Sequence, residues 1–204
     1  MLVNFCDACL RTDVTCSTVS TEGYEPANLV NNSDKGFLVY SCIKPPVHLD
    51  FLFICNIKLS HVIVWSQVGG QKSSGFRLAV KSSGSNQESF SDVSSAFLEK
   101  NHTGVFFHRR ELVNLSAPPN FLLRWMKSLR TVDYASSLRI SIIKTENSVP
   151  AIGRIEIWGS VSPQCGKDVS GNVAALWNNR FSKVLATSNP SNVHIEKDSV
   201  NKDW

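Results

Sequence analysis

The feature of this sequence that most constrains its fold is an alternating run directly after Pro45-Pro46. Apolar side chains occupy every second position from Val47 to Cys55, and the polar residues His48 and Asp50 lie between them. A period of two is the spacing of a β-strand that has one face in a core and the other in water. Proline also suits the first position of a strand, where a missing N–H group costs little. The run therefore predicts a strand at the start of an antiparallel β-sandwich.

Two further strands are predicted in the same block, residues 43–80. Val62 to Trp65 is a β-branched and aromatic run, and Gly69-Gly70 ends it. Phe76 to Val80 then alternates apolar and polar residues. The block is thus expected to hold three strands separated by tight connections, and nothing in it is typical of a catalytic site.

The β pattern continues through the first 165 residues. Leu138 to Ile142 and Ile155 to Trp158 alternate in the same way on either side of a short loop, which predicts an antiparallel hairpin. Residues 82–96 are rich in serine and are predicted to form a loop at one end of the sandwich. Shorter strands are expected at 2–5, 36–42, 105–108 and 121–126. Eight or nine strands and no helix before residue 160 predict an all-β fold, an antiparallel sandwich or jelly roll.

The 204 residues suit one domain with an appendage. We place the sandwich at residues 1–165. In residues 166–187, apolar side chains recur at three- and four-residue spacing between Val173 and Leu185, which predicts one short amphipathic helix. Residues 188–204 are polar and are expected to be a disordered tail.

Charge and hydropathy argue against several classes of protein. The net charge is +4, and Arg109-Arg110 is the only adjacent basic pair, too little for a nucleic-acid surface. No run approaches the roughly 18 apolar residues of a membrane helix, and the N-terminus lacks the pattern of a signal peptide. We therefore expect a nuclear or cytoplasmic protein that binds neither nucleic acid nor membranes, with its six cysteines as thiols.

Several short motifs resemble those of a known family. Their order and approximate spacing over residues 1–165 are similar to the N-terminal region of the RING finger protein 37 family, also called the U-box domain-containing protein 5 family. The block Ile43–Val47 and the shared order of the motifs carry the resemblance. The matching stretches are Met1–Cys6 with Cys16, Gly23-Tyr24-Glu25 with Asn28-Leu29, Ile43-Lys44-Pro45-Pro46-Val47, Gly69-Gly70-Gln71 with Gly75, Phe107-His108-Arg109, Leu138-Arg139-Ile140, and Glu156-Ile157-Trp158-Gly159 with Cys165.

The resemblance implies a discoidin-like, galactose-binding-like sandwich attached to a ubiquitin ligase whose U-box and RING finger lie downstream. The 204 residues contain no U-box sequence and no run of Cys/His pairs for RING zinc ions. The chain is therefore similar to a ligase without its catalytic half, whether as a fragment, a short isoform or an incomplete gene model.

The function that we expect is a β-sandwich module that binds substrates, chaperone-type partners or other proteins for a U-box/RING-type ubiquitin ligase. A ubiquitin-conjugating enzyme would be bound only by the absent U-box. The main alternative is a discoidin-like adhesion module that binds a carbohydrate or a protein outside the cell. No catalytic, cofactor-binding or metal-binding residue is assigned, no cofactor is expected, and the sequence does not identify the binding residues.

The cysteines allow two other interpretations. Cys6-x-x-Cys9 with Cys16 has some features of a zinc site, but a structural site needs four ligands at short spacings, and no second C-x-x-C exists. We interpret these cysteines as small buried or half-buried thiols. Because the layout resembles that of secreted discoidin domains, a disulfide from one of them to Cys165 is the alternative for an extracellular protein.

Other polar clusters are interpreted as structural. The segment from His108 to Glu111 is either an anion pocket or a strand end that runs into a solvated loop, and we favour the strand end. Asp50 and Asp133 have no visible partner at acid–base spacing, and no G-x-S-x-G elbow positions a nucleophile. A hydrolase on this scaffold is therefore not expected.

Three aromatic residues are candidates for partner contacts. Trp158 faces away from Ile155 and Ile157 by alternation, so it either packs under the Cys165 segment or forms a rim contact. Phe90, Phe97 and the serine-rich stretch lie where we expect the variable loops of a sandwich, and hence the default site for partner binding.

Overall fold

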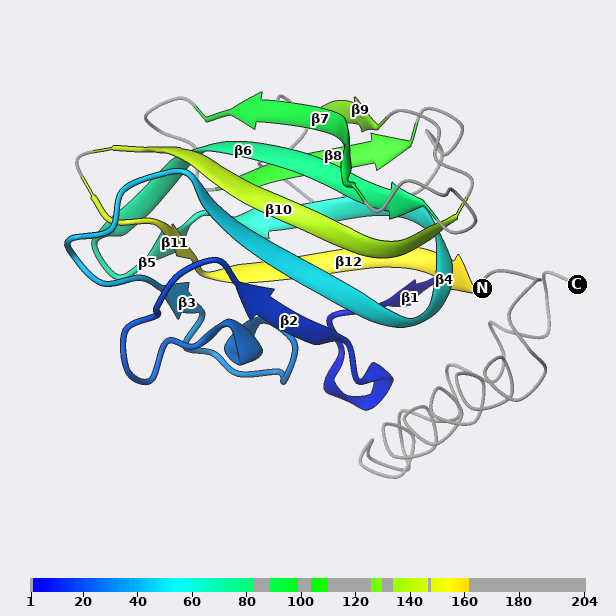
Figure 1. Cartoon of the computed structure of the whole chain (residues 1–204), viewed down its shortest axis with the longest axis horizontal. Helices are drawn as coiled ribbons and strands as arrows, with labels where there is room; N and C mark the ends of the chain where they lie inside the picture. The colour runs from blue at the N-terminus through cyan, green and yellow to red at the C-terminus, as the bar shows by residue number, and fades with distance from the viewer. Residues whose placement is uncertain are drawn as a thin grey trace, which may run out of the picture. The chain divides into compact units, whose positions relative to one another are not determined.

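A single long strand, β4 (Val47–Trp65), passes through both layers of the fold in the computed structural model of the chain (Figure 1). The chain divides into two compact units, residues 1–165 and 166–204. The predicted helix at 173–185 and the tail at 188–204 lie outside the described residues. The structure describes residues 2–82, 89–98, 104–109, 126–129, 134–146 and 148–161.

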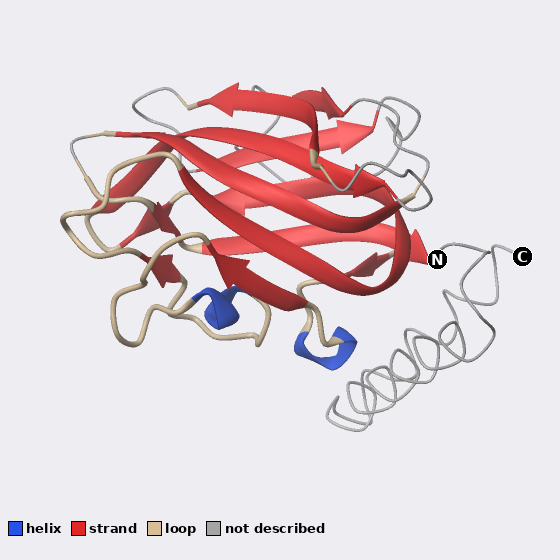
Figure 2. Ribbon diagram, in the orientation of Figure 1, coloured by secondary structure: helices blue, strands red, loops and turns tan. Residues whose placement is uncertain are grey.

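Strands dominate the described part of the chain, and the helical pieces there are two short 3₁₀ turns (Figure 2). In chain order the elements are β1 (Val3–Asn4), η1 (Ala8–Leu10), β2 (Asp13–Cys16), η2 (Pro26–Leu29), β3 (Phe37–Leu38), β4 (Val47–Trp65), β5 (Gln67–Val68), β6 (Gln71–Ser82), β7 (Ser91–Phe97), β8 (Gly104–Arg109), β9 (Met126–Leu129), β10 (Ala135–Thr145), β11 (Ala151–Ile152) and β12 (Arg154–Val161).

The two halves of β4 belong to different layers. Residues 47–52 pair with β2 on one side and β10 on the other, whereas residues 57–65 pair with β12 and β8. The sheet continues from β10 to β6 and β7, and from β12 to β1. Figure 1 shows β4 turning from the front layer to the rear layer at the right of the view. The predicted all-β antiparallel sandwich is confirmed, with one parallel pair, β8 with β9.

The predicted break between the first two strands of the 43–80 block is wrong, because the two runs form one strand. No glycine or proline occurs between His48 and Val64, so this stretch lacks the two residues that most strongly interrupt a strand. The strand instead accommodates its change of layer by bending, and by a bulge at Ser60, which lies between the paired residues Leu59 and His61.

The predicted hairpin of residues 138–142 with 155–158 is also wrong. β10 pairs with β4 and β6, and β12 pairs with β4 and β1, so both strands are neighbours of β4 and not of each other. The intervening loop carries β11, which pairs with β3 in a separate two-stranded sheet. Alternation predicted correctly which side chains are buried, but it contains no information on the partner strand.

The serine-rich stretch is shorter as a loop than predicted. β6 extends to Ser82, and Ser91–Phe97 forms β7, with Val93 and Ala96 buried against the core. The strand expected at 36–42 contains only Phe37–Leu38 with an isolated bridge at Val39. The strand expected at 121–126 lies almost wholly outside the described residues.

The core fills the space between the two layers. The alternation from Val47 to Cys55 holds, since its odd-numbered apolar residues are all buried. Side chains from β4, β6, β8, β10 and β12 meet there, and the largest fully buried ones include Phe51, Phe76, Phe107, Leu78 and Ile140. Two outer faces remain: the front face, formed by β2, residues 47–52 of β4, β10, β6 and β7, and the rear face, formed by β1, β12, residues 57–65 of β4 and β8.

Candidate functional site

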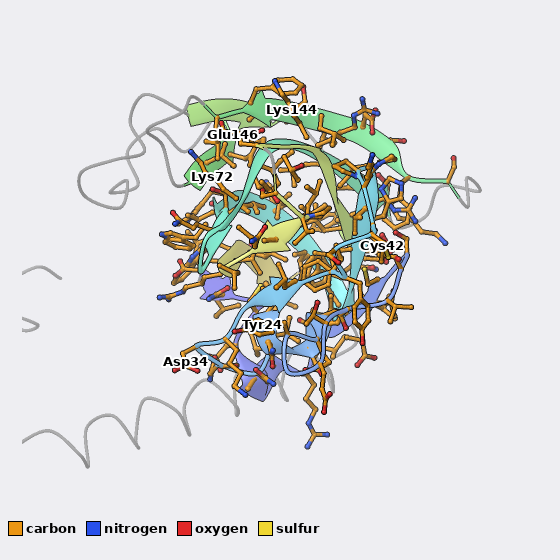
Figure 3. The ribbon with its side chains drawn as sticks, turned by 90° about the vertical axis from the view of Figure 1, so that its left-hand side faces the viewer. Tyr24, Asp34, Cys42, Lys72, Lys144 and Glu146 are labelled. Carbon is orange, nitrogen blue, oxygen red and sulfur yellow. The ribbon has the colours of Figure 1, made fainter. Side chains whose placement is uncertain are left out.

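An open hollow of about 700 Å³ lies where the end of β4 meets the start of β12. Trp65 and Arg154 contribute their side chains from these two strands, and they are directly paired in the ladder. The loop between β2 and β3 supplies Tyr24, Asp34 and Lys35. Figure 3 looks at this end of the sandwich and shows Tyr24 and Asp34 in the same part of it.

The loop that carries Tyr24 is held by a turn and an amide clamp. Gly23 has a φ of 80° and occupies the third position of a turn closed by a hydrogen bond of 2.9 Å from Tyr24 N–H to Thr21 C=O. A positive φ at that position is what a type II turn requires of glycine. Asn28 Nδ2 then donates to the carbonyls of Gly23 and Gly36, at 2.9 and 3.0 Å. One amide thereby fixes both ends of the loop.

Gly36 docks the same loop onto the start of β12. Its φ is 73°, and a Cβ atom there would lie 2.7 Å from the carbonyl oxygen of Ile152 and 2.8 Å from that of Gly153. Only glycine permits this approach. The neighbouring residues Asp34 and Lys35 are consequently presented beside Arg154.

A second hollow of about 380 Å³ adjoins the first. The two hollows share Asp34, Gly153 and Arg154. The second is lined further by amide and hydroxyl side chains, among them Asn4 and Ser33. Asp34 and Arg154 line both hollows but form no ion pair with each other among the described residues, so a ligand could use both.

A ladder of side chains on the rear face orients Arg154. Its guanidinium lies over the Trp65 ring, 5.1 Å from the centroid, and its Nη2 donates to Glu156 Oε1 at 2.6 Å. Trp158 Nε1 donates to Glu156 Oε2 at 2.8 Å. Trp158 in turn stacks on His61, with ring centroids 5.7 Å apart. We call these five residues the rear ladder.

The rear ladder leaves Arg154 available for binding. Both carboxylate oxygens of Glu156 are engaged within the ladder, and its side chain is only 13% exposed. The Arg154 side chain, by contrast, is 68% exposed. A preorganised arginine beside an indole ring is the type of group that anchors protein interfaces. The arrangement can bind a ligand.

Four cysteines of the described residues are free thiols. Cys6, Cys16, Cys42 and Cys55 form no disulfide. Burial raises the pKa of the Cys6 thiol far above its ordinary value, although a backbone hydrogen bond from Ile157 acts in the opposite direction. Burial likewise raises the pKa of Cys16. Cys165 lies outside the described residues, as does any bridge to it.

The other residues singled out from the sequence lie apart from the hollows. Within the described ranges, no group of three or more His, Cys, Asp or Glu side chains is arranged to hold a metal ion. Asp50 has a partner that sequence reasoning missed, a two-pronged ion pair with Arg139 at 2.6 and 2.7 Å on the front face. His108 is registered opposite His61 in β8, and Arg110, Glu111 and Asp133 lie outside the described residues.

The three aromatic candidates lie in different parts of the structure. Trp158 is part of the rear ladder, as its outward alternation indicated. Phe90 lies in the connection between β6 and β7, as predicted, with the Arg139 guanidinium 4.1 Å from its ring centroid. Phe97 is instead the last residue of β7 and does not belong to a loop. In the part of the chain that the structure describes, no helix is long and apolar enough to span a membrane.

Comparison with known proteins places the chain in a family. Residues 4–181 match the family described as a family of unknown function (DUF5918). The chain belongs to this family. It is also similar to RING finger protein 37 of Homo sapiens, with 24% identity over 94% of the chain and 42% of that protein. RING finger protein 37 of Mus musculus is 26% identical over 86% of the chain and 39% of its length. The chain therefore spans less than half of these relatives, and the resemblance noted from the motifs is confirmed.

Solved structures confirm the galactose-binding-like fold for this DUF5918 member. The family 32 CBM of C. perfringens NanJ, solved with galactose, superposes with a TM-score of 0.57 at 8% identity, covering 78% of this chain and 99% of that one. A chitosan-binding module from Paenibacillus sp. gives 0.52 at 10% identity, over 74% of this chain and 96% of the module. At such identities the likeness concerns the fold alone.

Sequence reasoning missed the hollow and the role of Trp65. The outward alternation of Arg154, Glu156 and Trp158 was visible in the sequence, but the strand that lies beside them was not. Pairing β12 with the second half of β4 is what brings Trp65 to Arg154 and His61 to Trp158.

Proposed function

We propose that this DUF5918 member is the partner-binding module of a U-box/RING-type ubiquitin ligase, with the ligase activity supplied by segments other than this sandwich. The observation that carries the proposal is the extent of the similarity to RING finger protein 37. It covers nearly the whole of this chain but less than half of the relatives. A division of labour between a binding sandwich and a separate catalytic portion of the relatives would account for that pattern.

The partner would dock at the two adjoining hollows and the rear ladder. Trp65, Arg154 and Tyr24 are of the three residue types that most often dominate binding energy at protein interfaces. Arg154 is held in place before binding, so its immobilisation costs little when a partner arrives. We place the module in the nucleus, the cytoplasm or both, where its thiols remain reduced.

Proximity labelling tests this role. The chain is fused to a biotin ligase and expressed in cells as the wild type and as the Trp65→Ala/Arg154→Ala double variant. We expect a reproducible set of proteins that is labelled by the wild type and lost in the double variant. Candidates from the set are then tested for direct binding with purified protein.

The matched control is Arg77→Ala, which removes an exposed arginine from the front face, where it pairs with Asp92 at 3.6 Å. The labelled set should be unchanged in this variant. If the double variant labels the same proteins as the wild type, the hollows are not the partner site. If none of the labelled proteins binds the purified chain or is ubiquitinated by a RING finger protein 37 carrying the module, the proposed role itself is wrong.

A carbohydrate is the second candidate ligand, favoured by the chemistry of the larger hollow. An indole ring beside a carboxylate and a guanidinium suits the apolar face and the hydroxyl groups of a sugar, and the similar NanJ module was solved with galactose. Arg154 already covers part of the Trp65 ring, so we rank this candidate below a protein partner. Calorimetric titration with galactose tests it: saturable heat that disappears in Trp65→Ala would favour the sugar.

A further inference from the structure

Four residues in register form a row across the front face, on the neighbouring strands β2, β4, β10 and β6 (Figure 1). Asp13 of β2 is registered opposite Leu52 of β4, Leu52 opposite Ser137 of β10, and Ser137 opposite Lys81 of β6. Directly opposed residues of antiparallel strands present their side chains on the same face. Across the face, the row therefore runs from an anionic residue through an apolar and a small polar residue to a cationic one.

The row forms an open groove of about 460 Å³. Leu52 is 53% exposed, and Ser137, which is only 7% exposed, leaves a depression beside it. Phe90 forms part of the rim, and its ring is held by the guanidinium of Arg139 at 4.1 Å. Asp50 fixes that guanidinium in turn through two hydrogen bonds. The groove thus combines a protruding side chain, Leu52, with a depression beside it at Ser137.

The charges at the two ends of the row are not paired within the described chain. Asp13 and Lys81 are absent from its ion pairs, whereas the nearby Asp50 and Asp92 each pair with an arginine. Three strand spacings separate Asp13 from Lys81, roughly 14 Å, which exceeds the Debye length of about 10 Å at 0.1 M salt. The two charges consequently do little for each other in one molecule.

We propose that the front face binds a second copy of this chain. A two-fold axis lying between the facing sheets, parallel to their strands and midway between Leu52 and Ser137, places each Asp13 opposite Lys81 of the other copy. The same operation brings each Leu52 to the depression at Ser137, beside the other copy's Phe90. The row is complementary to itself under this symmetry, in charge and in shape, as an isologous interface requires.

The dimer is weak. The row is roughly 14 Å long, so the facing patch is smaller than the roughly 800 Å² per partner of a standard interface. Exposed ion pairs add only modest energy. We therefore expect a dissociation constant on the order of 100 µM, which rises with ionic strength because both ion pairs are at the surface.

Sedimentation equilibrium of the whole 204-residue chain tests the proposal through a charge exchange. Asp13→Lys and Lys81→Asp should each weaken association by roughly tenfold or more, since each replaces two attractions with two repulsions. The double variant should regain the association of the wild type. Leu52→Asp should abolish dimers, whereas Val19→Asp, at another exposed apolar residue (65% exposed), should not.

Circular dichroism melting of each variant shows whether it is folded, and all the substituted positions except the half-buried Lys81 are exposed. A wild-type chain that stays monomeric up to its solubility limit overturns the proposal. So does a dimer whose association is insensitive to both single charge changes, or one that the double variant does not restore. None of these outcomes bears on whether a partner uses the rear ladder, because Asp13, Leu52 and Lys81 lie on the opposite face.

Discussion

Because β4 is shared by both layers, we predict that the front and rear halves of the sandwich unfold as one unit. Ile140 lies in β10 on the front side and is fully buried, with Leu49 of β4 and Leu78 of β6 opposite it in the ladder. Replacing Ile140 with alanine should therefore destabilise both halves, although its ladder partners all lie on the front side.

The size of the stability loss depends on how far the surrounding residues can close the cavity that Ile140→Ala leaves. Strands on both sides of Ile140 are held by ladder hydrogen bonds, so the cavity left by Ile140→Ala stays largely open. Substitutions of buried isoleucine by alanine cost about 2–5 kcal/mol, and we expect the upper half of that range. For a domain of this size, that corresponds to a melting temperature lower by roughly 10 °C.

Urea denaturation with two probes measures this prediction. Far-UV circular dichroism reports on all strands, and tryptophan fluorescence reports on the rear face through Trp65 and Trp158. The remaining three tryptophans are first replaced by phenylalanine so that they do not contribute: Trp125, Trp177 and Trp204. In Ile140→Ala the two probes should shift together to lower urea.

The control is Ile54→Ala, because Ile54 is 40% exposed on β4 and should lose no more than about 1 kcal/mol. If fluorescence keeps its wild-type midpoint in Ile140→Ala while circular dichroism moves, the layers unfold separately and β4 does not couple them. A loss below about 1 kcal/mol would show instead that the core repacks around the cavity.

Three further outcomes are expected. Gly36→Ala should destabilise the fold by about 1–2 kcal/mol or more, because the new Cβ meets the carbonyl oxygens of Ile152 and Gly153 at a positive φ; an unchanged thermal melt would contradict this. Alkylation followed by mass spectrometry at mildly alkaline pH should label Cys42 first and Cys6 last, since burial raises the pKa of the Cys6 thiol and lowers its thiolate fraction; equal rates would be evidence against a packed N-terminal segment. With purified activating and conjugating enzymes, the chain alone should form no ubiquitin chains above background on an immunoblot, and clear chain formation would reveal a catalytic module within it.

The fold class was predictable because alternation is a local property. Val47 to Cys55 shows a period of two, and the structure buries the expected side of that run. Strand partners were not predictable, because any alternating strand can pair with any other through backbone groups that carry no sequence information. The supposed hairpin of residues 138–142 with 155–158 is the clearest case, since β4 lies between the two strands.

The candidate site was harder to predict from the sequence than the fold was. Trp65 and Arg154 are 89 residues apart, and their contact depends on the register of β12 against β4. Glycine supplied the one local signal that sequence reasoning could have used. Gly23 and Gly36 flank the loop that carries Asp34 and Lys35, and both have the positive φ that glycine favours.

The pairing of β1 with β12 has a mechanical consequence. Val3 is registered opposite Gly159, two residues before the end of β12 at Val161, and the strands are antiparallel, so the two ends of the sandwich emerge at the same end of one strand pair. Tension applied between them would open that pair like a zipper, loading one hydrogen bond at a time, instead of shearing all of them together. Force would next peel β12 from β4, removing the strand that carries Arg154, Glu156 and Trp158. A pull on the termini would thus dismantle the rear ladder first, and a bound partner would be released before the front layer yields.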